Sequence, residues 1–306
     1  MARIVLTGAS SFLGRALLLE LMRRGEECYA IVRPQSKALG SLKEYEGLHI
    51  VLCDMEDDAH WKENIPSCDV FFHLGWDGIG QKDRADPSIQ QVNVRNAIKC
   101  VRGAAELGAR RFLFSGSQAE YGIRTSITDE QAPCHPVTEY GKGKLRALEE
   151  CAYLAGKLGM DYVHMRIFSV YGPNDHPWAL VPDCIRTLLN NSTMELSSCT
   201  QMWNYLHVAD AARCLCELGN ASALRGTNVL NVASSDTRIL REFVEEIWVM
   251  TGKRGHLAFG ERKNSIENPV GLYPNISKLL SLVNWRPCVQ FSEGIHELIV
   301  REEERL

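Results

Sequence analysis

The 306-residue chain lacks several features that would place it in a specialised class of protein. No apolar run approaches the roughly 18 residues that a membrane-spanning helix requires, so we expect no membrane partner. No long basic run occurs and the formal net charge is -4, which leaves no electrostatic footprint for nucleic acid. The first apolar strand starts almost at Met1, so we expect no signal peptide.

Paired cysteines are also missing. The 11 cysteines are an odd number, and no Cys-x-x-Cys spacing occurs. Cys214 and Cys216 lie two residues apart in an expected helix, where they point to different faces. Together with the lack of a signal peptide, this pattern predicts a cytoplasmic protein whose reduced cysteines are small buried core residues. We also expect no metal site.

What the sequence does contain is a regular alternation of strands and helices over about 170 residues. The strands are apolar along their whole length, which is typical of a parallel sheet covered by helices on both faces. We therefore predict an α/β protein with a Rossmann-type doubly wound parallel sheet and a smaller C-terminal substrate-binding α/β domain. The expected strands are 3–6, 28–33, 49–55, 70–76, 110–117 and 162–168, and the expected helices between them include 15–25, 87–107 and 139–159.

The periodicity becomes less regular after "VYGPN", but "TNVLNVAS" has the pattern of a further strand of the same sheet. We assign residues 1–170 and about 205–235 to an NAD(P)-binding domain. Residues of about 171–204 and 236–306 are assigned to the substrate domain. We expect this second domain to close over the carboxyl ends of the strands, where open α/β sheets bind their ligands.

The stretch "TGASSFLG" between the first strand and the first helix predicts a dinucleotide site. Gly8 permits the tight turn, Gly14 lets the helix approach the strand, and the helix N-terminus attracts a pyrophosphate. Ser11 stands where a glycine is usual, and its hydroxyl is able to donate to a phosphate oxygen. The turn residues expected to contact the cofactor are Gly8, Ser10, Ser11, Phe12, Leu13 and Gly14.

The end of the second strand indicates which dinucleotide binds. NAD-binding proteins place an acid there, whereas this chain has Arg33, which suits the extra phosphate of NADP(H). The alternative is that Arg33 is a solvated charge at a strand end. Asp54 is expected to accept from the adenine amine while Met55 packs against the ring; a solvated loop acid is the alternative for Asp54.

A second candidate site is formed by a tyrosine, a lysine and a serine. Tyr140 and Lys144 in "YGKGK" are four residues apart and share one face of a helix. The lysine charge lowers the pKa of the tyrosine, which makes a proton donor or acceptor near neutral pH. Ser117 ends the fifth strand and is placed to bond the substrate oxygen, or alternatively only a local backbone group.

With these residues the chain resembles the extended short-chain dehydrogenase/reductases, in the group of nucleotide-sugar epimerases, dehydratases and reductases. The resemblance covers nearly the whole chain, and Ser11 is its departure in the glycine turn. It rests on "TGASSFLG", "CDM", "FFHLGW", "FSGSQAEYG", "YGKGK", "MRIFSVYGPND", "QMWNYLHVADAARCL" and "LVNWRP".

The resemblance implies further contacts and a partner. Besides Tyr140 and Lys144, it adds to the cofactor site Leu74, Gly75, Trp76, Asn93, Ser115, Ile167 and Val170. It also implies a homodimer through a four-helix interface built from the helices around 92–107 and 140–158. The substrate is expected to contact Ser117, Gln118, Glu120, Asn174 and Val181.

The same resemblance implies a specific gap on the substrate side. The family often has a diphosphate-binding arginine where this chain has Trp203. Either Arg238 or Arg262 replaces that arginine, or the sugar nucleotide lies differently; Trp203 itself is a substrate or a core residue.

The choice of reaction also follows from the resemblance. Dehydratases carry an Asp-Glu pair where this chain has Gln118 and Ala119. The Cys and His of the relatives that epimerise beside the ketone are replaced by Ala119 and Ala179. What remains is an NADPH-dependent 4-reductase of a nucleotide-linked 4-keto-6-deoxyhexose, or an NAD-dependent 4-epimerase, with Arg33 favouring the reductase. Two less favoured functions are a ketoreductase acting on a non-sugar carbonyl and a cofactor-sensing scaffold.

Overall fold

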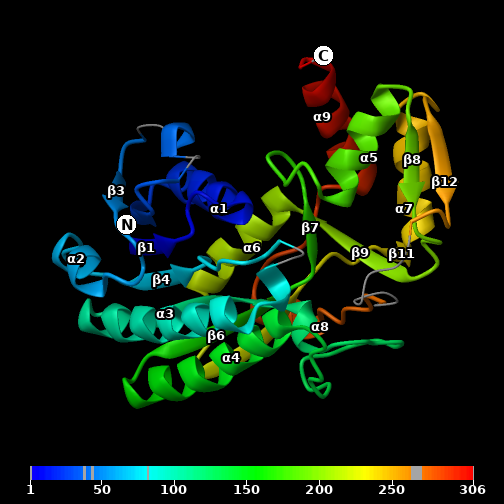
Figure 1. Ribbon diagram of the computed structural model, residues 1–306. Coiled ribbons are helices and arrows are strands. Elements are labelled where there is room, and N and C mark those ends of the chain that lie inside the picture. The colour runs from blue at the N-terminus through cyan, green and yellow to red at the C-terminus, as the bar shows by residue number, and fades with distance from the viewer. Residues whose placement is uncertain (1, 37–38, 43–44, 81–82, 263–270, 306) are drawn as a thin grey trace.

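A seven-stranded parallel sheet forms the larger part of the molecule. The computed structural model describes residues 2–36, 39–42, 45–80, 83–262 and 271–305. The strand order is β10-β6-β5-β4-β1-β2-β3, with every neighbouring pair parallel, so the Rossmann-type fold is confirmed (Figure 1). These strands are β1 (Arg3–Thr7), β2 (Glu27–Val32), β3 (Leu48–Leu52), β4 (Val70–His73), β5 (Arg111–Ser117), β6 (Asp161–Ile167) and β10 (Thr227–Val232).

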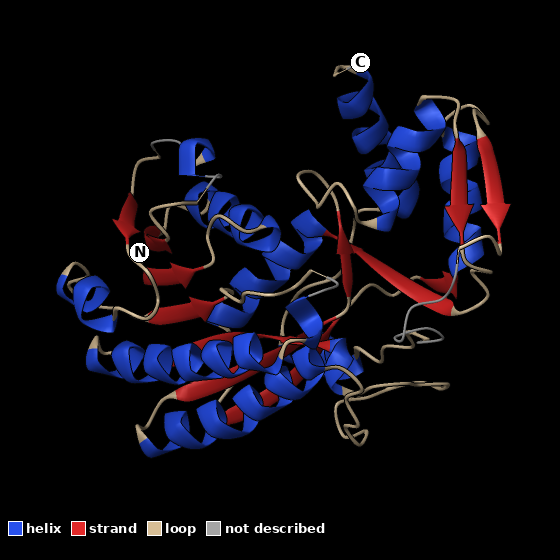
Figure 2. Cartoon of the chain, viewed as in Figure 1, coloured by secondary structure: helices blue, strands red, loops and turns tan. Residues whose placement is uncertain are grey.

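Helices cover both faces of this sheet, and each layer has its own apolar core (Figure 2). One core is closed by α1 (Phe12–Arg23) and α6 (Val208–Asn220). The other is closed by α2 (Asp58–Glu63), α3 (Pro87–Glu106) and α4 (Glu139–Lys157). Apart from the edge strand β3, which exposes three of its five residues, the strands are largely buried, which is why they could be recognised in the sequence as continuous apolar runs.

The smaller part consists of two short sheets packed against three helices. Strands β11, β9 and β7 form one sheet, and β12 and β8 form the other. A separate core lies among the helices of this domain. The elements are β7 (Ser169–Tyr171), β8 (Thr193–Leu196), β9 (Met202–His207), β11 (Thr237–Ile239), β12 (His256–Phe259), α5 (Leu180–Leu189), α7 (Leu240–Met250) and α9 (Phe291–Glu303).

One segment does not follow the expected division of the chain. We expected 236–306 to lie wholly in the substrate domain, but α8 (Ser277–Leu282) packs into the core of the nucleotide-binding part. Leu279, Val283 and Trp285 are all buried in the cluster that α1 and α6 close. The indole N–H of Trp285 donates to the carbonyl oxygen of Asp210 at the start of α6 (3.0 Å). The chain thus returns to the first domain before α9.

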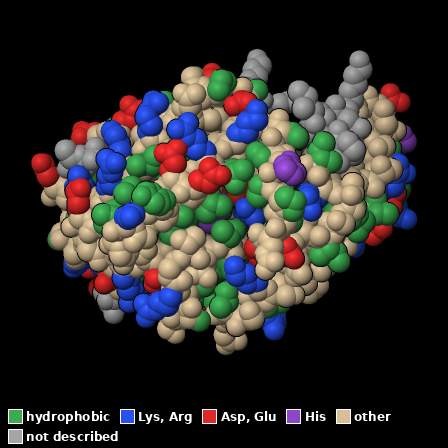
Figure 3. All heavy atoms as spheres, turned by 90° about the horizontal axis from the view of Figure 1, so that it is seen from below, with side chains coloured by type: hydrophobic (Ala, Val, Ile, Leu, Met, Phe, Trp, Pro, Cys, Tyr) green, Lys and Arg blue, Asp and Glu red, His purple; other side chains and the backbone are tan. Residues whose placement is uncertain are grey.

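The cysteines are all free thiols, and nine of the 11 are buried, as expected. Cys134 is half-buried and Cys288 is exposed, so the expectation of buried core residues is wrong for these two. Charged side chains of both signs are interspersed with apolar ones over the face shown in Figure 3. Within the described residues, no helix has the length and apolar character needed to cross a bilayer.

Candidate functional site

The turn after β1 has the backbone geometry that a dinucleotide-binding loop requires. Gly8 has φ of +73°, and a Cβ there would lie 2.6 Å from the amide nitrogen of Gly75. A Cβ on Gly14 would lie 1.9 Å from the carbonyl oxygen of Gly8. Both positions therefore accept only glycine without a backbone shift. The close packing brings the N-terminus of α1 to the carboxyl edge of the sheet, so this cradle fits a pyrophosphate.

Ser11 has a structural role that explains why glycine is not needed there. Its φ of -75° and ψ of 169° are open to any residue, and it is the N-cap of α1. The Ser11 hydroxyl accepts from the amide N–H of Gly14 at 3.1 Å. The serine caps the helix and keeps its own hydroxyl proton free to donate.

Arg33 lies beyond the end of β2, as expected, but it has a carboxylate partner. Its Nη1 atom lies 2.9 Å from Oδ1 of Asp77, and both side chains are about half exposed. Asn93 fixes that partner: its side-chain amide accepts from the Asp77 N–H (3.0 Å) and donates to the Asp77 carbonyl (2.9 Å). Asn93 is buried and its amide holds the loop after β4, so its expected cofactor contact stays a prediction.

Several other expected cofactor residues lie at or after the carboxyl ends of strands of the large sheet, whereas Val170 lies in the smaller sheet that contains β7. Leu74 and Gly75 follow β4, and Met55 lies against Gly75 with its sulfur 2.8 Å from the position of a Gly75 Cβ. Asp54 is exposed, and its carboxylate accepts from the N–H of Glu56. Ser115 lies in β5, Ile167 ends β6 and Val170 lies in β7. The cofactor contacts expected of these three residues stay a prediction.

Tyr140 lies in the first turn of α4, with its ring between two side chains of the β4–α3 region. The Arg84 guanidinium lies 4.3 Å from the ring centroid, and Trp76 meets the ring edge-on at 6.4 Å. A Cβ on the next residue, Gly141, would lie 2.5 Å from the Ala119 carbonyl oxygen. This close approach brings the start of α4 against the segment that follows Ser117.

Lys144 lies one helical turn further along α4 and is almost completely buried. Its Nζ atom donates to the Ser115 carbonyl oxygen at 2.6 Å and lies 3.9 Å from the centroid of the Trp76 ring. Burial lowers the pKa of Lys144 to about 7. The lysine is therefore able to gain or lose a proton in the neutral range, beside the tyrosine that the sequence analysis singled out.

Ser117 ends β5 and begins a 3-10 turn, Gln118–Glu120. Its hydroxyl accepts from the N–H of Ala119 (3.2 Å), which leaves the hydroxyl proton free. Gln118 is half-buried beside it. The expected contact of Glu120 with the sugar is wrong, because Glu120 is fully buried and both carboxylate oxygens already have partners inside the protein.

Three of the expected substrate residues lie in other surroundings. Val181 is 2% exposed and belongs to the core of the smaller domain, and its expected substrate contact stays a prediction. Trp203 is half-buried and packs at the edge of two apolar clusters, as its core alternative predicted. Arg238 is bound to Asp236 (3.0 Å) and Glu246 (2.8 Å). Arg238 would therefore have to break its ion pairs with Asp236 and Glu246 in order to bind the diphosphate as expected.

Arg262 is exposed shortly after β12, and its backbone N–H donates to the Leu196 carbonyl oxygen.

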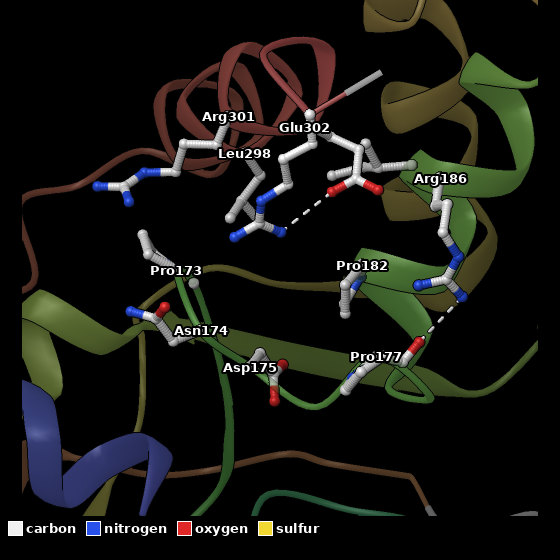
Figure 4. A pocket seen from close by; sticks show the side chains of 12 residues that line it. Pro173, Asn174, Asp175, Pro177, Pro182, Arg186, Leu298, Arg301 and Glu302 are labelled. Carbon is white, nitrogen blue, oxygen red and sulfur yellow. Dashed lines mark hydrogen bonds and ion pairs between the residues drawn. The ribbon is translucent and has the colours of Figure 1, made fainter. Parts of the chain in front are cut away.

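Asn174 has φ of 67° and lines a cavity of about 130 Å³ between the β7–α5 loop, α5 and α9 (Figure 4). Burial raises the pKa of its neighbour Asp175 to about 6. Ser117, Tyr140 and Lys144, the candidate catalytic residues, do not line this cavity.

Two cations were missed by the sequence analysis. Arg84 stacks on Tyr140, and Arg15 of α1 donates to the Asn174 carbonyl oxygen at 3.2 Å, which joins the two domains. Neither belongs to a recognisable motif, since each contact depends on a loop that folds back from elsewhere in the chain. The 81–82 pair beside Arg84 lies outside the described residues.

The sequence profile described as "NAD dependent epimerase/dehydratase family" matches residues 4–233 of this chain. The chain is also similar to a UDP-N-acetyl-alpha-D-glucosaminuronate decarboxylase of Bacillus cytotoxicus, with 24% identity over 97% of this chain and 96% of the relative. A dTDP-4-dehydro-6-deoxyglucose reductase of Escherichia coli is 20% identical over 97% of this chain and 96% of its own length.

Among solved structures, a UDP-glucuronic acid 4-epimerase from Bacillus cereus, in complex with UDP-glucuronic acid and NAD, has the same fold. The TM-score is 0.83 and the identity 20%, and the match covers 99% of this chain and all of the other. Different reactions are therefore found on this one architecture, and the choice among them depends on side chains.

Proposed function

Because this chain is an enzyme of the NAD dependent epimerase/dehydratase family, we propose that it uses NADPH to reduce the C4 ketone of a nucleotide-linked 4-keto-6-deoxyhexose. The observation that carries the proposal is the end of β2, where Arg33 stands in place of an acid. A carboxylate there would repel the additional phosphate of NADPH, whereas a guanidinium bonds it.

The pairing of Arg33 with Asp77 is compatible with this role. Both side chains are about half exposed, and ion pairs in such surroundings contribute about 0–1 kcal/mol. A phosphate dianion forms stronger charge-assisted bonds with the same guanidinium. Arg33 is therefore able to exchange its carboxylate partner for the cofactor at little cost.

The catalytic roles follow from the arrangement of three side chains. When bound, NADPH supplies the hydride that C4 accepts. Tyr140 donates its phenolic proton to the C4 oxygen, which completes the alcohol, and the Ser117 hydroxyl donates a hydrogen bond to that oxygen. Lys144, with a pKa near neutrality, supports the loss of the Tyr140 proton and takes part in replacing it.

A 4-epimerase with bound NAD is the second candidate, because a structural neighbour of this chain is named as a 4-epimerase in complex with NAD. Ser117, Tyr140 and Lys144 serve both reactions, and in the epimerase Tyr140 first acts as a base. The absence of an acid at positions 118 and 119, which are Gln118 and Ala119, favours both over a dehydratase.

The two candidates differ in what happens to the cofactor. Purified protein is mixed with NADPH or NADH and a panel of nucleotide-linked 4-keto-6-deoxysugars, and the absorbance of the reduced nicotinamide is followed. Consumption with a preference for NADPH is the expected result. Three results together would favour the epimerase over the reductase: no reduced cofactor is consumed, denaturing the protein releases NAD, and the protein interconverts nucleotide sugars at C4.

We further propose that the protein is a homodimer through α3 and α4. The two helices lie side by side on the outer face of the sheet (Figure 1), and α4 exposes 68% of Tyr153. Light scattering on the intact protein is expected to give twice the chain mass. Tyr153→Glu is expected to shift it toward the monomer; a wild-type protein that is monomeric at all concentrations would exclude the dimer.

A further inference from the structure

Glu120 is a buried carboxylate immediately behind the catalytic serine. Its Oε1 atom accepts from the Ser117 amide N–H at 2.7 Å and from Nε2 of His164 at 2.9 Å. Its Oε2 atom accepts from Nε of Arg166 at 2.8 Å. None of its side chain is exposed, so protein groups rather than water form these hydrogen bonds with the carboxylate.

The space around this cluster is shaped for it. A Cβ on Gly116 would lie 2.3 Å from His164 Nε2 and 2.8 Å from Glu120 Oε1, so only glycine lets both groups approach β5. The Arg166 guanidinium stacks on the Tyr121 ring at 4.4 Å, and its Nη1 atom donates to the Glu130 carbonyl oxygen at 3.3 Å. These contacts raise the question of what the buried Glu120–His164–Arg166 cluster contributes to the protein.

Stability is an insufficient reason. Taking a carboxylate and a guanidinium out of water costs free energy that their attraction seldom exceeds, and apolar residues of similar size often stabilise a core as well. Burial acts to raise the pKa of Glu120, but His164 and Arg166 outweigh it and hold that pKa below its usual value. The protein therefore maintains a buried negative charge beside its candidate site.

We propose that Glu120 is a positioning residue that fixes the main chain of Ser117 and so aims the Ser117 hydroxyl at the substrate oxygen. The Glu120 carboxylate holds the Ser117 N–H, while the Ser117 hydroxyl accepts from the Ala119 N–H. These reciprocal bonds fix both the backbone and the side chain of the serine. The inference rests on the proposed function only through the role of Ser117, which reductase and epimerase share.

The same carboxylate acts on Lys144. Burial lowers the pKa of Lys144, the charge of Glu120 opposes that decrease, and Arg84 adds to it. His73 of β4 and Tyr140 of α4 also face the lysine, and burial keeps His73 neutral with a pKa of about 3. Removing the Glu120 charge is therefore expected to lower the pKa of Lys144 and move the alkaline limb of the activity profile to lower pH.

A double-mutant cycle between Glu120 and Ser117 separates positioning from folding. We expect Glu120→Ala to lower kcat about 10- to 100-fold, with KM and cofactor affinity changed less than about threefold. In a Ser117→Ala background, at a pH below the alkaline limb of both proteins, the same substitution is expected to lower kcat less than about threefold. Losses that multiply in the double variant would overturn the proposal. Glu106 is an exposed carboxylate at the end of α3, and Glu106→Gln is the matched control, which should change neither kcat nor KM.

Hydrogen exchange gives a readout that does not depend on turnover. The Ser117 amide is expected to exchange at least about tenfold faster in Glu120→Ala, in a peptide covering 114–122, while peptides of α1 stay unchanged. If exchange is unaltered, Glu120 does not hold Ser117. A wild-type protein inactive on every nucleotide sugar would instead remove the proposed function and leave this measurement valid.

If Glu120→Ala does not fold, the double substitution Glu120→Leu with Arg166→Met removes both buried charges together with the acceptor of the Ser117 N–H, and is used in the same cycle. It is expected to fold and to show the same loss of kcat and the same shift of the alkaline limb. Wild-type kcat in this double variant would overturn the positioning role.

Discussion

The Nζ atom of Lys144 lies 3.9 Å from the centroid of the Trp76 ring. The Trp76 indole is held in turn by a bond from its N–H to Gln90 Oε1 at 2.8 Å. An ammonium over a tryptophan face is stabilised, but less than by full hydration. Burial lowers the pKa of this lysine, which is 2% exposed, to about 7, and the Glu120 charge opposes the decrease.

The stability of the protein should therefore depend on pH through Lys144. Its pKa is about 7 in the folded chain and 10.5 as the ordinary value, so the unfolded chain binds more protons between these limits. Stability relative to Lys144→Met is thus expected to rise with pH over that window, by on the order of a few kcal/mol in total. Urea unfolding of both proteins at several pH values measures it. A difference that stays constant with pH would contradict the depressed pKa.

Tyr140→Phe is expected to remove most of the turnover while leaving the cofactor bound. The substitution deletes only the hydroxyl, so the ring keeps its contacts with Arg84 and Trp76. Loss of a proton donor costs about 10²- to 10⁴-fold in kcat. Steady-state rates and a cofactor titration test both halves, with Tyr153→Phe, on the proposed dimer face of α4 and outside the candidate site, as the control. Full activity of Tyr140→Phe would exclude it as the donor.

The sequence was sufficient for the sheet because most of its strands, the edge strand β3 excepted, are buried and apolar along their length. The pairing of Tyr140 with Lys144 on α4 could also be predicted, because residues four apart lie on the same face of a helix. The strands of the smaller domain were missed: β7 and β11 have three residues each, and β8 alternates exposed and buried positions over only four. Segments this short are fixed by tertiary packing rather than by local pattern.

The site shows the same division between local and distant contacts. Ser117 could be predicted because it ends a strand, whereas the role of Glu120 depends on His164 and Arg166, which follow more than 40 residues later. The sequence places Glu120 three residues after Ser117 but does not say which way it points. Likewise, Arg33 was found at a strand end, but its partner Asp77 comes from the loop after β4.

Cofactor preference should respond in opposite directions to changes at Arg33 and Asp77. Arg33→Gln removes the cation for the additional phosphate and is expected to weaken NADPH binding about 10- to 100-fold, with little effect on NADH. Asp77→Asn frees Arg33 from its carboxylate, so NADPH affinity should rise a few-fold. Parallel titrations with both cofactors measure this. Equal losses for NADPH and NADH in Arg33→Gln would show that Arg33 does not bind that phosphate.

Ser11 should be replaceable in the glycine turn, whereas Gly14 should not. Ser11→Gly keeps an acceptable N-cap, so cofactor affinity is expected to stay within a few-fold and stability within a few tenths of a kcal/mol. Ser11→Ala loses the bond to the Gly14 N–H and should cost about 1 kcal/mol of stability. Gly14→Ala is the contrasting variant, because its Cβ would lie 1.9 Å from the Gly8 carbonyl oxygen. An affinity loss above about 100-fold in Ser11→Gly, equal to about 2.7 kcal/mol, would instead make the hydroxyl an essential phosphate ligand.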